Sequence, residues 1–244
     1  MKNDFLVVIP ARLGSKRLPG KPLIKFNGIP MIIKTFIQCN KVIKKEKILI
    51  ATDSKKIKKV CNQYNVNCII TSKKCLTGTD RVFEVAKKIK KKFYINLQGD
   101  EPFFYPKDIK KFINFSKKNS SQIINGYCQI NKKEDYFNVN VPKVVFNNQK
   151  NLLYMSRSPI PANKKKLFQK AFRQVCIYSF PREKLLRFGK QKKKSLFEYE
   201  EDIEILRFIE IGEKVKMIKL SSNSLSVDTK KDYIAAKKKF EKIK

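Results

Sequence analysis

The sequence predicts an α/β fold in which a mostly parallel sheet is covered by helices on both faces. In the first half of the chain, short apolar runs alternate with amphipathic segments of helical spacing. These runs are apolar at nearly every position, which is typical of strands buried on both faces. With 244 residues and 42% hydrophobic content, the chain can bury a large core. No repeat or Pro/Ser-rich linker divides it, so we expect a single domain over residues 1–244.

The first half of the chain contributes the regular part of this pattern. Its apolar runs predict strands, and the segments between them, with hydrophobic side chains three or four positions apart, predict helices. Thr79 is suitably placed to cap the last of these helices. The expected strands are 5–11, 47–53, 67–71 and 93–100, and the expected helices are 30–42, 54–65 and 79–92.

The pattern changes after residue 120. Three segments there predict strands of hairpin or insertion character, at 122–130, 142–147 and 174–180. A helix ended by Gly212, two further strands and a closing helix follow, at 196–212, 214–220, 225–229 and 230–244. We therefore predict a smaller inserted β-rich region beside the main sheet.

The loop after the first strand is the most informative stretch. Residues 7–23, VVIPARLGSKRLPGKPL, run from an apolar strand into a segment with two glycines and four cations, namely Gly14, Gly20, Arg12, Lys16, Arg17 and Lys21. Glycines permit close backbone approach, and the cations neutralise phosphate oxygens. The loop is not a Walker A motif, because Pro19 stands where that motif needs a glycine, and it is not GxGxxG. It predicts phosphate binding, with a plain surface loop as the alternative.

The net charge of +35 comes mainly from lysine. The lysines are scattered along the chain in runs such as KKIKK, which favours solvated helix faces over a dedicated polyanion surface. A basic nucleic-acid-binding protein remains the non-enzyme alternative, and it predicts lysines focused on one face. Arginine is rare here, and its bidentate geometry suggests a specific need at four motif-like positions, Arg12, Arg17, Arg81 and Arg157.

The cysteine and histidine content excludes several kinds of site. The six cysteines form no CxxC pair, so a zinc ribbon or thioredoxin-like site is not expected. We expect reduced thiols in a cytoplasmic protein without a membrane segment. The chain has no histidine, which excludes a Ser-His-Asp or Cys-His mechanism and a histidine-ligated zinc. A metal would be held by oxygen ligands, which favours Mg²⁺.

Two aspartates are candidate ligands for such an ion. Asp100 and Asp228 each follow an apolar run and lie far apart in the sequence. Because ligands of open α/β sheets collect at the carboxyl ends of strands, we expect the two carboxylates to share a divalent ion that bridges phosphates. The alternative for each is a strand-end aspartate that caps the next helix.

Several blocks of sequence, in a fixed order, extend over nearly the whole chain. They are IPARLGSKRLPGKPL (9–23), ATD (51–53), TGTDR (77–81), NLQGDEP (96–102), VPKVV (141–145), YMSRSPIP (154–161), IYSF (177–180), FEYEEDIEILRFIEIGEKV (197–215) and SVDTKKD (226–232). In these blocks the chain resembles the 3-deoxy-manno-octulosonate (Kdo) cytidylyltransferases. The resemblance implies a Rossmann-like nucleotidyltransferase sheet, an inserted region for dimerisation and sugar binding, and a homodimer.

The resemblance also implies an activity and a set of site residues. The enzyme would transfer CMP from CTP to the anomeric hydroxyl of a Kdo-type sugar acid and release pyrophosphate, for lipopolysaccharide biosynthesis. The implied catalytic residues are Arg12, Lys21, Asp100 and Asp228, the last two holding Mg²⁺. The implied CTP-binding residues are Pro10, Ala11, Arg12, Ser15, Arg17, Lys21, Thr77, Gly78, Thr79, Arg81 and Gln98. The implied sugar-binding residues are Gln98, Arg157, Gln174, Tyr178, Asp202 and Glu204.

Two departures from the family pattern concern the sugar. Gln174 stands where the family has a histidine, and Glu204-Ile205 replaces a Glu-Gln pair, preceded by Asp202 in place of an apolar residue. The added acid suggests an 8-amino-3,8-dideoxy analogue of Kdo as an alternative substrate, because Asp202 could pair with an ammonium group. Family drift, or a solvated helix charge at Asp202, is the simpler explanation. A sialic- or pseudaminic-acid cytidylyltransferase is the other enzyme alternative.

Overall fold

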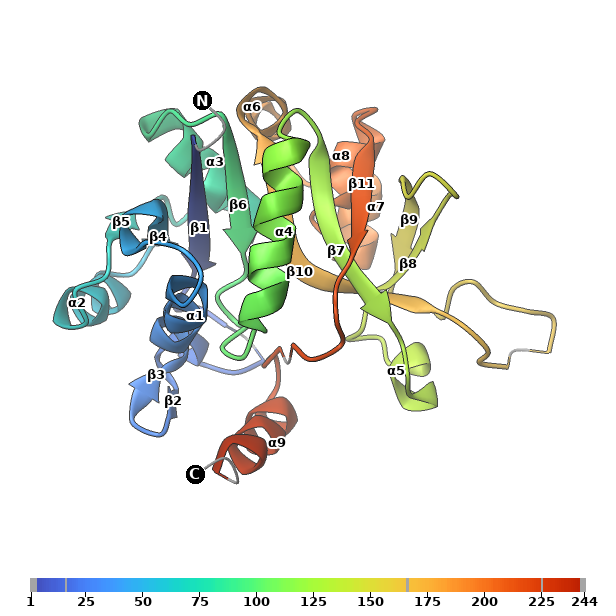
Figure 1. Cartoon of the computed structure of the whole chain (residues 1–244), viewed down its shortest axis with the longest axis horizontal. Coiled ribbons are helices and arrows are strands. Elements are labelled where there is room, and N and C mark those ends of the chain that lie inside the picture. Colours follow the sequence, from blue (N-terminus) through green and yellow to red (C-terminus); the bar gives the residue numbers. More distant parts are fainter. Residues whose placement is uncertain (1–3, 16, 166, 225, 242–244) are drawn as a thin grey trace.

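The computed structural model describes residues 4–15, 17–165, 167–224 and 226–241. A central sheet runs in the order β11-β7-β10-β6-β1-β4-β5. Its strands are β1 (Phe5–Ala11), β4 (Ile48–Thr52), β5 (Cys68–Ile70), β6 (Phe93–Leu97), β7 (Ile123–Gln129), β10 (Phe172–Pro181) and β11 (Val215–Lys219). β1 pairs in parallel with β4 and β6, β4 with β5, and β7 with β11, while β10 lies antiparallel between β6 and β7. The predicted mostly parallel sheet is therefore confirmed (Figure 1).

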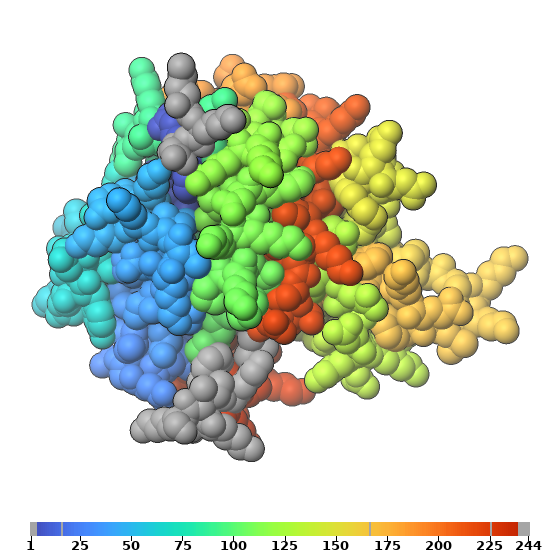
Figure 2. Space-filling model, viewed as in Figure 1, coloured from blue at the N-terminus to red at the C-terminus, as the bar shows by residue number. Residues whose placement is uncertain are grey.

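Helices cover both faces of this sheet. One face carries α1 (Met31–Asn40), α2 (Lys55–Gln63) and α4 (Pro106–Lys118), and the other carries α3 (Gly78–Lys88), α6 (Arg182–Lys190), α7 (Leu196–Glu201) and α8 (Leu206–Glu210). Successive β1 residues alternate between the two cores: Val7 packs with the first group and Val8 with the second. This is why the strand is continuously apolar. Figure 2 shows α4 in bright green over the middle of the first face.

Smaller elements surround the sheet. β8 (Lys143–Phe146) and β9 (Leu152–Ser156) form an antiparallel hairpin that joins the sheet through β10. β8 pairs with the first residues of β10, Phe172 and Arg173, whereas β6 pairs with its last residues, 177–181. Of the three strands predicted for an inserted β-rich region, only 142–147 lies in this hairpin, as β8, whereas 122–130 and 174–180 are β7 and β10 of the central sheet. The role of the hairpin in dimerisation stays a prediction. The remaining elements are η1 (Lys21–Leu23), β2 (Lys25–Phe26), β3 (Ile29–Pro30), η2 (Lys45–Lys47), α5 (Lys133–Phe137) and α9 (Lys230–Glu241).

Three expectations about local structure were wrong. The helix predicted over 196–212 is broken into α7 and α8 at Asp202, whose φ of +48° is left-handed. The strand predicted over 225–229 does not form at the described residues 226–229, where Val227 N–H instead donates to the Asp100 carbonyl oxygen at 3.0 Å. The cap of α3 is Thr77, not Thr79. Lys16, Leu225 and residues 242–244 lie outside the described residues.

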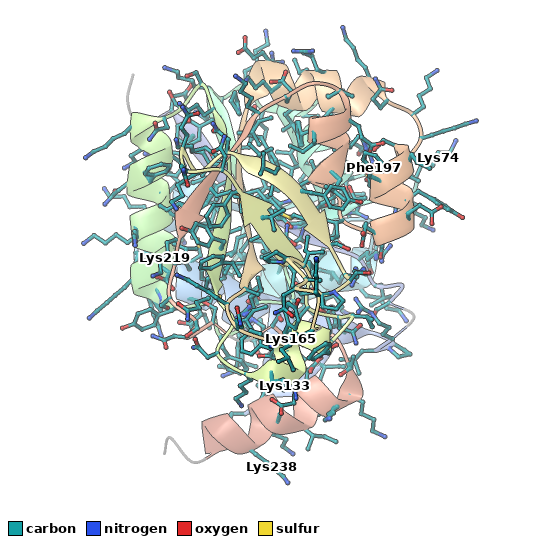
Figure 3. All side chains as sticks on the ribbon, turned by 90° about the vertical axis from the view of Figure 1, so that its right-hand side faces the viewer. Lys74, Lys133, Lys165, Phe197, Lys219 and Lys238 are labelled. Carbon is teal, nitrogen blue, oxygen red and sulfur yellow. The ribbon has the colours of Figure 1, made fainter. Side chains whose placement is uncertain are left out.

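Lysine side chains project from many elements. Figure 3 labels Lys133 of α5, Lys219 of β11 and Lys238 of α9, which extend from different parts of the surface. This spread is what solvated faces produce, whereas a nucleic-acid surface concentrates its cations. Among the described residues, no helix combines the length and the apolar character needed to cross a membrane.

Candidate active site

A cavity of about 530 Å³ opens at the carboxyl ends of β1 and β6. Its position agrees with the rule that open α/β sheets bind ligands at this edge. All the predicted site residues except Thr79 line it: Pro10, Ala11, Arg12, Ser15, Arg17, Lys21, Thr77, Gly78, Arg81, Gln98, Asp100, Arg157, Gln174, Tyr178, Asp202, Glu204 and Asp228. Residues more than two hundred positions apart in the chain are thus brought to one site.

The ends of β1 and β6 approach each other closely at the cavity floor. A Cβ added to Gly99 would lie 2.6 Å from the carbonyl oxygen of Pro10, so a larger residue does not fit between them. Beyond this floor, Arg12, Gly14, Ser15 and Arg17 line the cavity, and Ser15 Oγ accepts a hydrogen bond from Leu18 N–H at 3.3 Å. Gly20, at φ +67°, then leads into η1, which begins with Lys21. The glycine therefore helps to direct Lys21 into the cavity.

Lys21 joins the two predicted metal ligands. Its Nζ lies 2.7 Å from Asp100 Oδ2 and 2.9 Å from Asp228 Oδ1, and Arg17 Nη2 lies 3.1 Å from the same Asp228 oxygen. Burial lowers the pKa of Lys21, but the two carboxylates outweigh it and the net shift is upward. Burial likewise raises the pKa of Asp228, and Lys21 and Arg17 reverse the shift to a net lowering. Lys21 and Asp228 are thus kept ionised.

The donor set of this cluster fits Mg²⁺. Asp100 and Asp228 both reach a single nitrogen atom within 3 Å, so their oxygens converge on one position. Among the described residues, no group of three or more His, Cys, Asp or Glu side chains is arranged to hold a metal. Mg²⁺ is usually held by one or two carboxylates, with substrate phosphates and water completing its octahedron. Two convergent carboxylates beside the loop predicted to bind phosphates meet that description.

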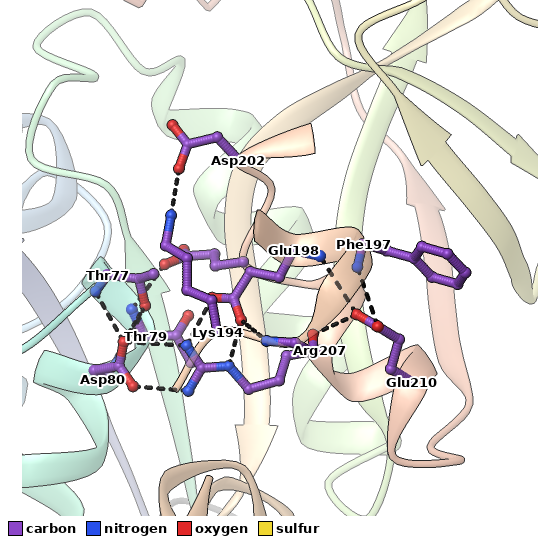
Figure 4. Close-up of polar contacts among 11 residues, drawn as sticks. Thr77, Thr79, Asp80, Lys194, Phe197, Glu198, Asp202, Arg207 and Glu210 are labelled. Atoms are coloured by element: carbon purple, nitrogen blue, oxygen red, sulfur yellow. Dashed lines mark hydrogen bonds and ion pairs between the residues drawn. The ribbon is translucent and has the colours of Figure 1, made fainter. Parts of the chain in front are cut away.

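The N-terminus of α3 is held by a buried ion cluster, shown in Figure 4. Thr77 and Asp80 form a capping box, in which Asp80 Oδ2 accepts from the Thr77 backbone N–H and hydroxyl at 2.8 and 2.7 Å. Arg207 of α8 donates to Asp80 Oδ1 at 2.9 Å and to both oxygens of Glu198 in α7 at 2.5 and 2.6 Å. The guanidinium also stacks on Phe188, 3.8 Å from its centroid. The TGTDR segment is therefore tied to α7 and α8.

Glu204 links that segment to the floor of the cavity. Its carboxylate accepts from Thr79 N–H at 2.9 Å and from Gln98 Nε2 at 2.6 Å. Burial raises the pKa of Glu204 to about 7. Thr79 is fully buried and does not line the cavity, and its backbone N–H contacts Glu204; its predicted contact with CTP stays a prediction.

The predicted arginine contacts differ from expectation in detail. Arg157 lines the cavity, but its guanidinium donates to backbone carbonyl oxygens: to Val139 at 2.9 Å, to Glu201 at 2.5 Å and to Asp202 at 3.1 Å. Arg81 is also engaged, with Asp53 at 3.0 Å and Thr71 Oγ1 at 2.5 Å. Neither side chain presents an open fork in this structure, because each holds neighbouring segments together.

The Asp202 carboxylate already has cationic partners. Lys194 Nζ lies 2.5 Å from it and Arg157 Nη2 lies 3.9 Å away, and the side chain is 70% exposed. An ammonium group of a sugar would have to compete with Lys194. The lining position of Asp202 agrees with the prediction, but its pairing favours the simpler explanation of a solvated charge.

The sequence prediction missed several lining residues, namely Cys75, Glu101, Asn140, Arg173 and Cys176. Glu101 is the most unusual, because it is buried and its Oε2 has no hydrogen-bond partner among the described groups. Burial, reinforced by Asp100, raises the pKa of Glu101 to about 8. The NLQGDEP block gave a signal, since Glu101 directly follows the predicted metal ligand.

Comparisons with known proteins agree with this geometry. Residues 6–215 match a family model described as cytidylyltransferase. The chain is 32% identical to the 3-deoxy-manno-octulosonate cytidylyltransferase of Escherichia coli over 227 residues, covering 93% of this chain and 92% of that protein. It is 35% identical over 242 residues to the enzyme of that name from Elusimicrobium minutum, covering 97% and 98% of the two chains. The solved structure of CMP:2-keto-3-deoxy-manno-octonic acid synthetase complexed with CTP superposes with a TM-score of 0.89 at 29% identity, covering 99% of this chain and 100% of that chain.

Proposed function

Because this chain belongs to the 3-deoxy-manno-octulosonate cytidylyltransferase family, we propose that it transfers CMP from CTP to the anomeric hydroxyl of Kdo, releasing pyrophosphate, for lipopolysaccharide biosynthesis. The observation that carries the proposal is the cluster of Lys21, Asp100 and Asp228 at the end of the 12–20 loop. It brings cations and convergent carboxylates to one place, as a triphosphate with a divalent ion requires.

The nucleotide occupies the part of the cavity between the 12–20 loop and α3 in this proposal. Arg12, Arg17 and Lys21 supply the positive charge for its phosphates, and Ser15 supplies a hydroxyl. Lys21 exchanges its present carboxylate partners for phosphate oxygens. The TGTDR segment, held by Arg207, frames the cytosine through Thr77 and Gly78.

The sugar acid occupies the part of the cavity lined by Gln98, Gln174, Tyr178 and Glu204. Its 2-hydroxyl oxygen forms a bond to the α-phosphorus of CTP while the bond from that phosphorus to the oxygen bridging it to the β-phosphorus breaks; pyrophosphate leaves with that oxygen, and the hydroxyl proton passes to water. The protein supplies mainly orientation and charge neutralisation, since phosphoryl transfer asks for little covalent participation. Arg157 stays assigned to the sugar carboxylate, using the donors that its backbone contacts leave unused.

Asp100 and Asp228 are the proposed Mg²⁺ ligands. When bound, the ion would lower the pKa of a coordinated hydroxyl and neutralise phosphate charge. The role of this chain is to hold the two carboxylates close together, which Lys21 and Arg17 already do.

A homodimer and a cytoplasmic location complete the proposal. Leu153 of β9 and Leu196, Phe197 and Tyr199 of α7 are large exposed hydrophobic residues, and Phe197 contacts Tyr154 with a ring separation of 5.7 Å. Phe197 faces the viewer in Figure 3. An exposed apolar group of this kind fits a subunit interface. The cytoplasm is proposed on the cysteine usage given above.

Pyrophosphate release from CTP tests the proposal, with Mg²⁺ present and a panel of sugar acids offered as acceptors. Kdo is expected to be the preferred acceptor, and the 8-amino analogue and sialic or pseudaminic acids are the alternatives in the panel. A chain that releases no pyrophosphate with any of these acceptors would refute the proposal. Thermal stabilisation by mixed nucleic acid but not by CTP with Mg²⁺ would favour the non-enzyme alternative.

A further inference from the structure

Strand β10 carries a bulge beside the sugar-binding part of the cavity. Its register against β7 shifts between Val175 and Tyr178. A bulge leaves backbone groups without partners in the strand ladder and redirects the side chains that follow. Cys176 and Tyr178, on the bulged segment, both line the cavity. The bulge therefore shapes this wall of the site.

Asn125 of β7 satisfies the carbonyl groups that the bulge exposes. Its side chain is fully buried, and its Nδ2 donates to the carbonyl oxygens of Val175 at 3.1 Å and Ile177 at 2.9 Å. Both N–H groups are thereby used, so Oδ1 is left as an acceptor. Gln174 Nε2 donates to this oxygen at 3.2 Å. These contacts fix which end of the Asn125 amide is the nitrogen and which is the oxygen.

This contact in turn sets the direction of the Gln174 amide. Gln174 is 6% exposed and lines the cavity. Because its Nε2 faces Asn125, its Oε1 points away from that residue. Within the described chain no group donates to Oε1, and the atom is not among those sealed from the surface without a partner. The oxygen therefore reaches the cavity as a free acceptor.

We propose that Asn125 is a positioning residue for the sugar acid: it holds Gln174 with Oε1 toward the cavity, where this oxygen accepts a hydrogen bond from a hydroxyl or ammonium group of the sugar. The inference rests on the proposed function. An acceptor fixed in a buried site discriminates strongly between sugars. A sugar without the matching donor displaces water from the oxygen and leaves it without a hydrogen bond. Gln174 is thus the specificity-determining group, and Asn125 acts through it.

The test measures kcat/KM for Kdo and for its mono-deoxy analogues by pyrophosphate release. For the wild-type chain, kcat/KM is expected to be about tenfold lower with the analogue that lacks the donor facing Gln174 than with Kdo. In Gln174→Leu, kcat/KM for Kdo is expected to fall by the same factor. The variant should then give equal kcat/KM values for Kdo and that analogue, with KM for CTP unchanged. If Gln174→Leu keeps the wild-type ratio between Kdo and every analogue, the inference is overturned.

Asn125→Ala tests the positioning role. It is expected to lower the ratio of kcat/KM between Kdo and that analogue. In the Gln174→Leu background it should not lower this ratio further, because Asn125 acts through Gln174. Asn119→Ala is the matched control: that side chain donates to the Phe115 carbonyl at the end of α4 and does not line the cavity, so its loss lowers stability without changing discrimination. If Asn125→Ala does not fold, Asn125→Ser replaces it.

The outcomes separate this inference from the proposed function. An Asn125 variant that lowers kcat/KM equally for Kdo and all analogues has lost only structure, and the positioning role is then wrong. A wild-type chain that transfers CMP to no sugar acid refutes the proposed function instead.

Discussion

Replacing Arg207 with methionine removes the cation that joins α3 to α7 and α8. The guanidinium is fully buried, 2.5 and 2.6 Å from the two carboxylate oxygens of Glu198 and 2.9 Å from Asp80. Methionine keeps much of the aliphatic volume beside Phe188 but leaves Glu198, which is 0% exposed, without its cation. The expected result is a large loss of stability that comes from charge rather than from packing.

The size of that loss follows from the burial of Glu198. Removing one partner of a buried ion pair costs about 3–5 kcal/mol, because the remaining charge stays desolvated. In a chain of this length such a loss lowers Tm by roughly 6–20 °C. Removing the stranded charge as well, in Arg207→Met with Glu198→Gln, should recover most of the loss, since uncharged replacements of buried pairs are often neutral.

Urea unfolding of the single and double variants measures these free energies. Arg187→Met is the matched control, because that arginine also pairs with a glutamate, Glu213, but its side chain is 60% exposed. Glu213 is buried but keeps a second cation, Lys184 at 2.9 Å, after this change, so no buried charge is left alone and the loss should stay below about 1 kcal/mol. If Arg207→Met loses no more stability than Arg187→Met, or if Glu198→Gln deepens the loss, the buried cluster does not hold the helices as argued.

Four further variants examine the site. Asp100→Asn and Asp228→Asn should each reduce pyrophosphate release to background, since each removes one of the two convergent carboxylates; near-normal turnover in either would refute the metal assignment. Burial raises the pKa of Glu204 to about 7 from an unfolded value of about 4.3, so the folded chain retains a proton that the unfolded chain releases between these values. Its contribution to stability is therefore complete below about pH 4 and is lost as the pH rises through 7, and Glu204→Gln should show a smaller fall in unfolding free energy between pH 5 and pH 8 than wild type; an unchanged fall contradicts this. Gly99→Ala places a Cβ 2.6 Å from a β1 carbonyl oxygen, and the resulting shift should lower kcat by roughly tenfold to a hundredfold; a wild-type kcat would show that the floor tolerates it.

The sheet was predictable from the sequence because its strands are buried on both faces. Val7 and Val8 serve opposite cores, and this requirement appears directly as an unbroken apolar run. The break between α7 and α8 was not predictable in the same way. It occurs at Asp202, where Arg157 donates to the carbonyl oxygens of Glu201 and Asp202. A contact across 44 residues of sequence thus overrides a local pattern that favours one helix.

The candidate site was predictable to a similar degree. Asp100 and Asp228 were expected to meet, and both lie against Lys21. Asp228 reaches the site differently from the prediction, because it follows an irregular segment rather than a strand. The contacts of Arg157 with three backbone carbonyl groups had no sequence signal, since backbone acceptors are present at every residue.

The two departures on the sugar side turn out to differ in kind. Asp202 is mostly exposed and paired with Lys194, so solvent and a neighbouring cation already neutralise its effect on a ligand. Gln174 is buried, and its amide is held in one orientation by the hydrogen bond from Nε2 to Asn125 Oδ1. A buried group of fixed direction discriminates between ligands far better than an exposed charge of variable conformation. If the proposed function holds, we therefore expect selectivity among sugar acids to come from Asn125 and Gln174, with an ammonium-bearing sugar recognised there as a hydrogen-bond donor rather than at Asp202 as a charge.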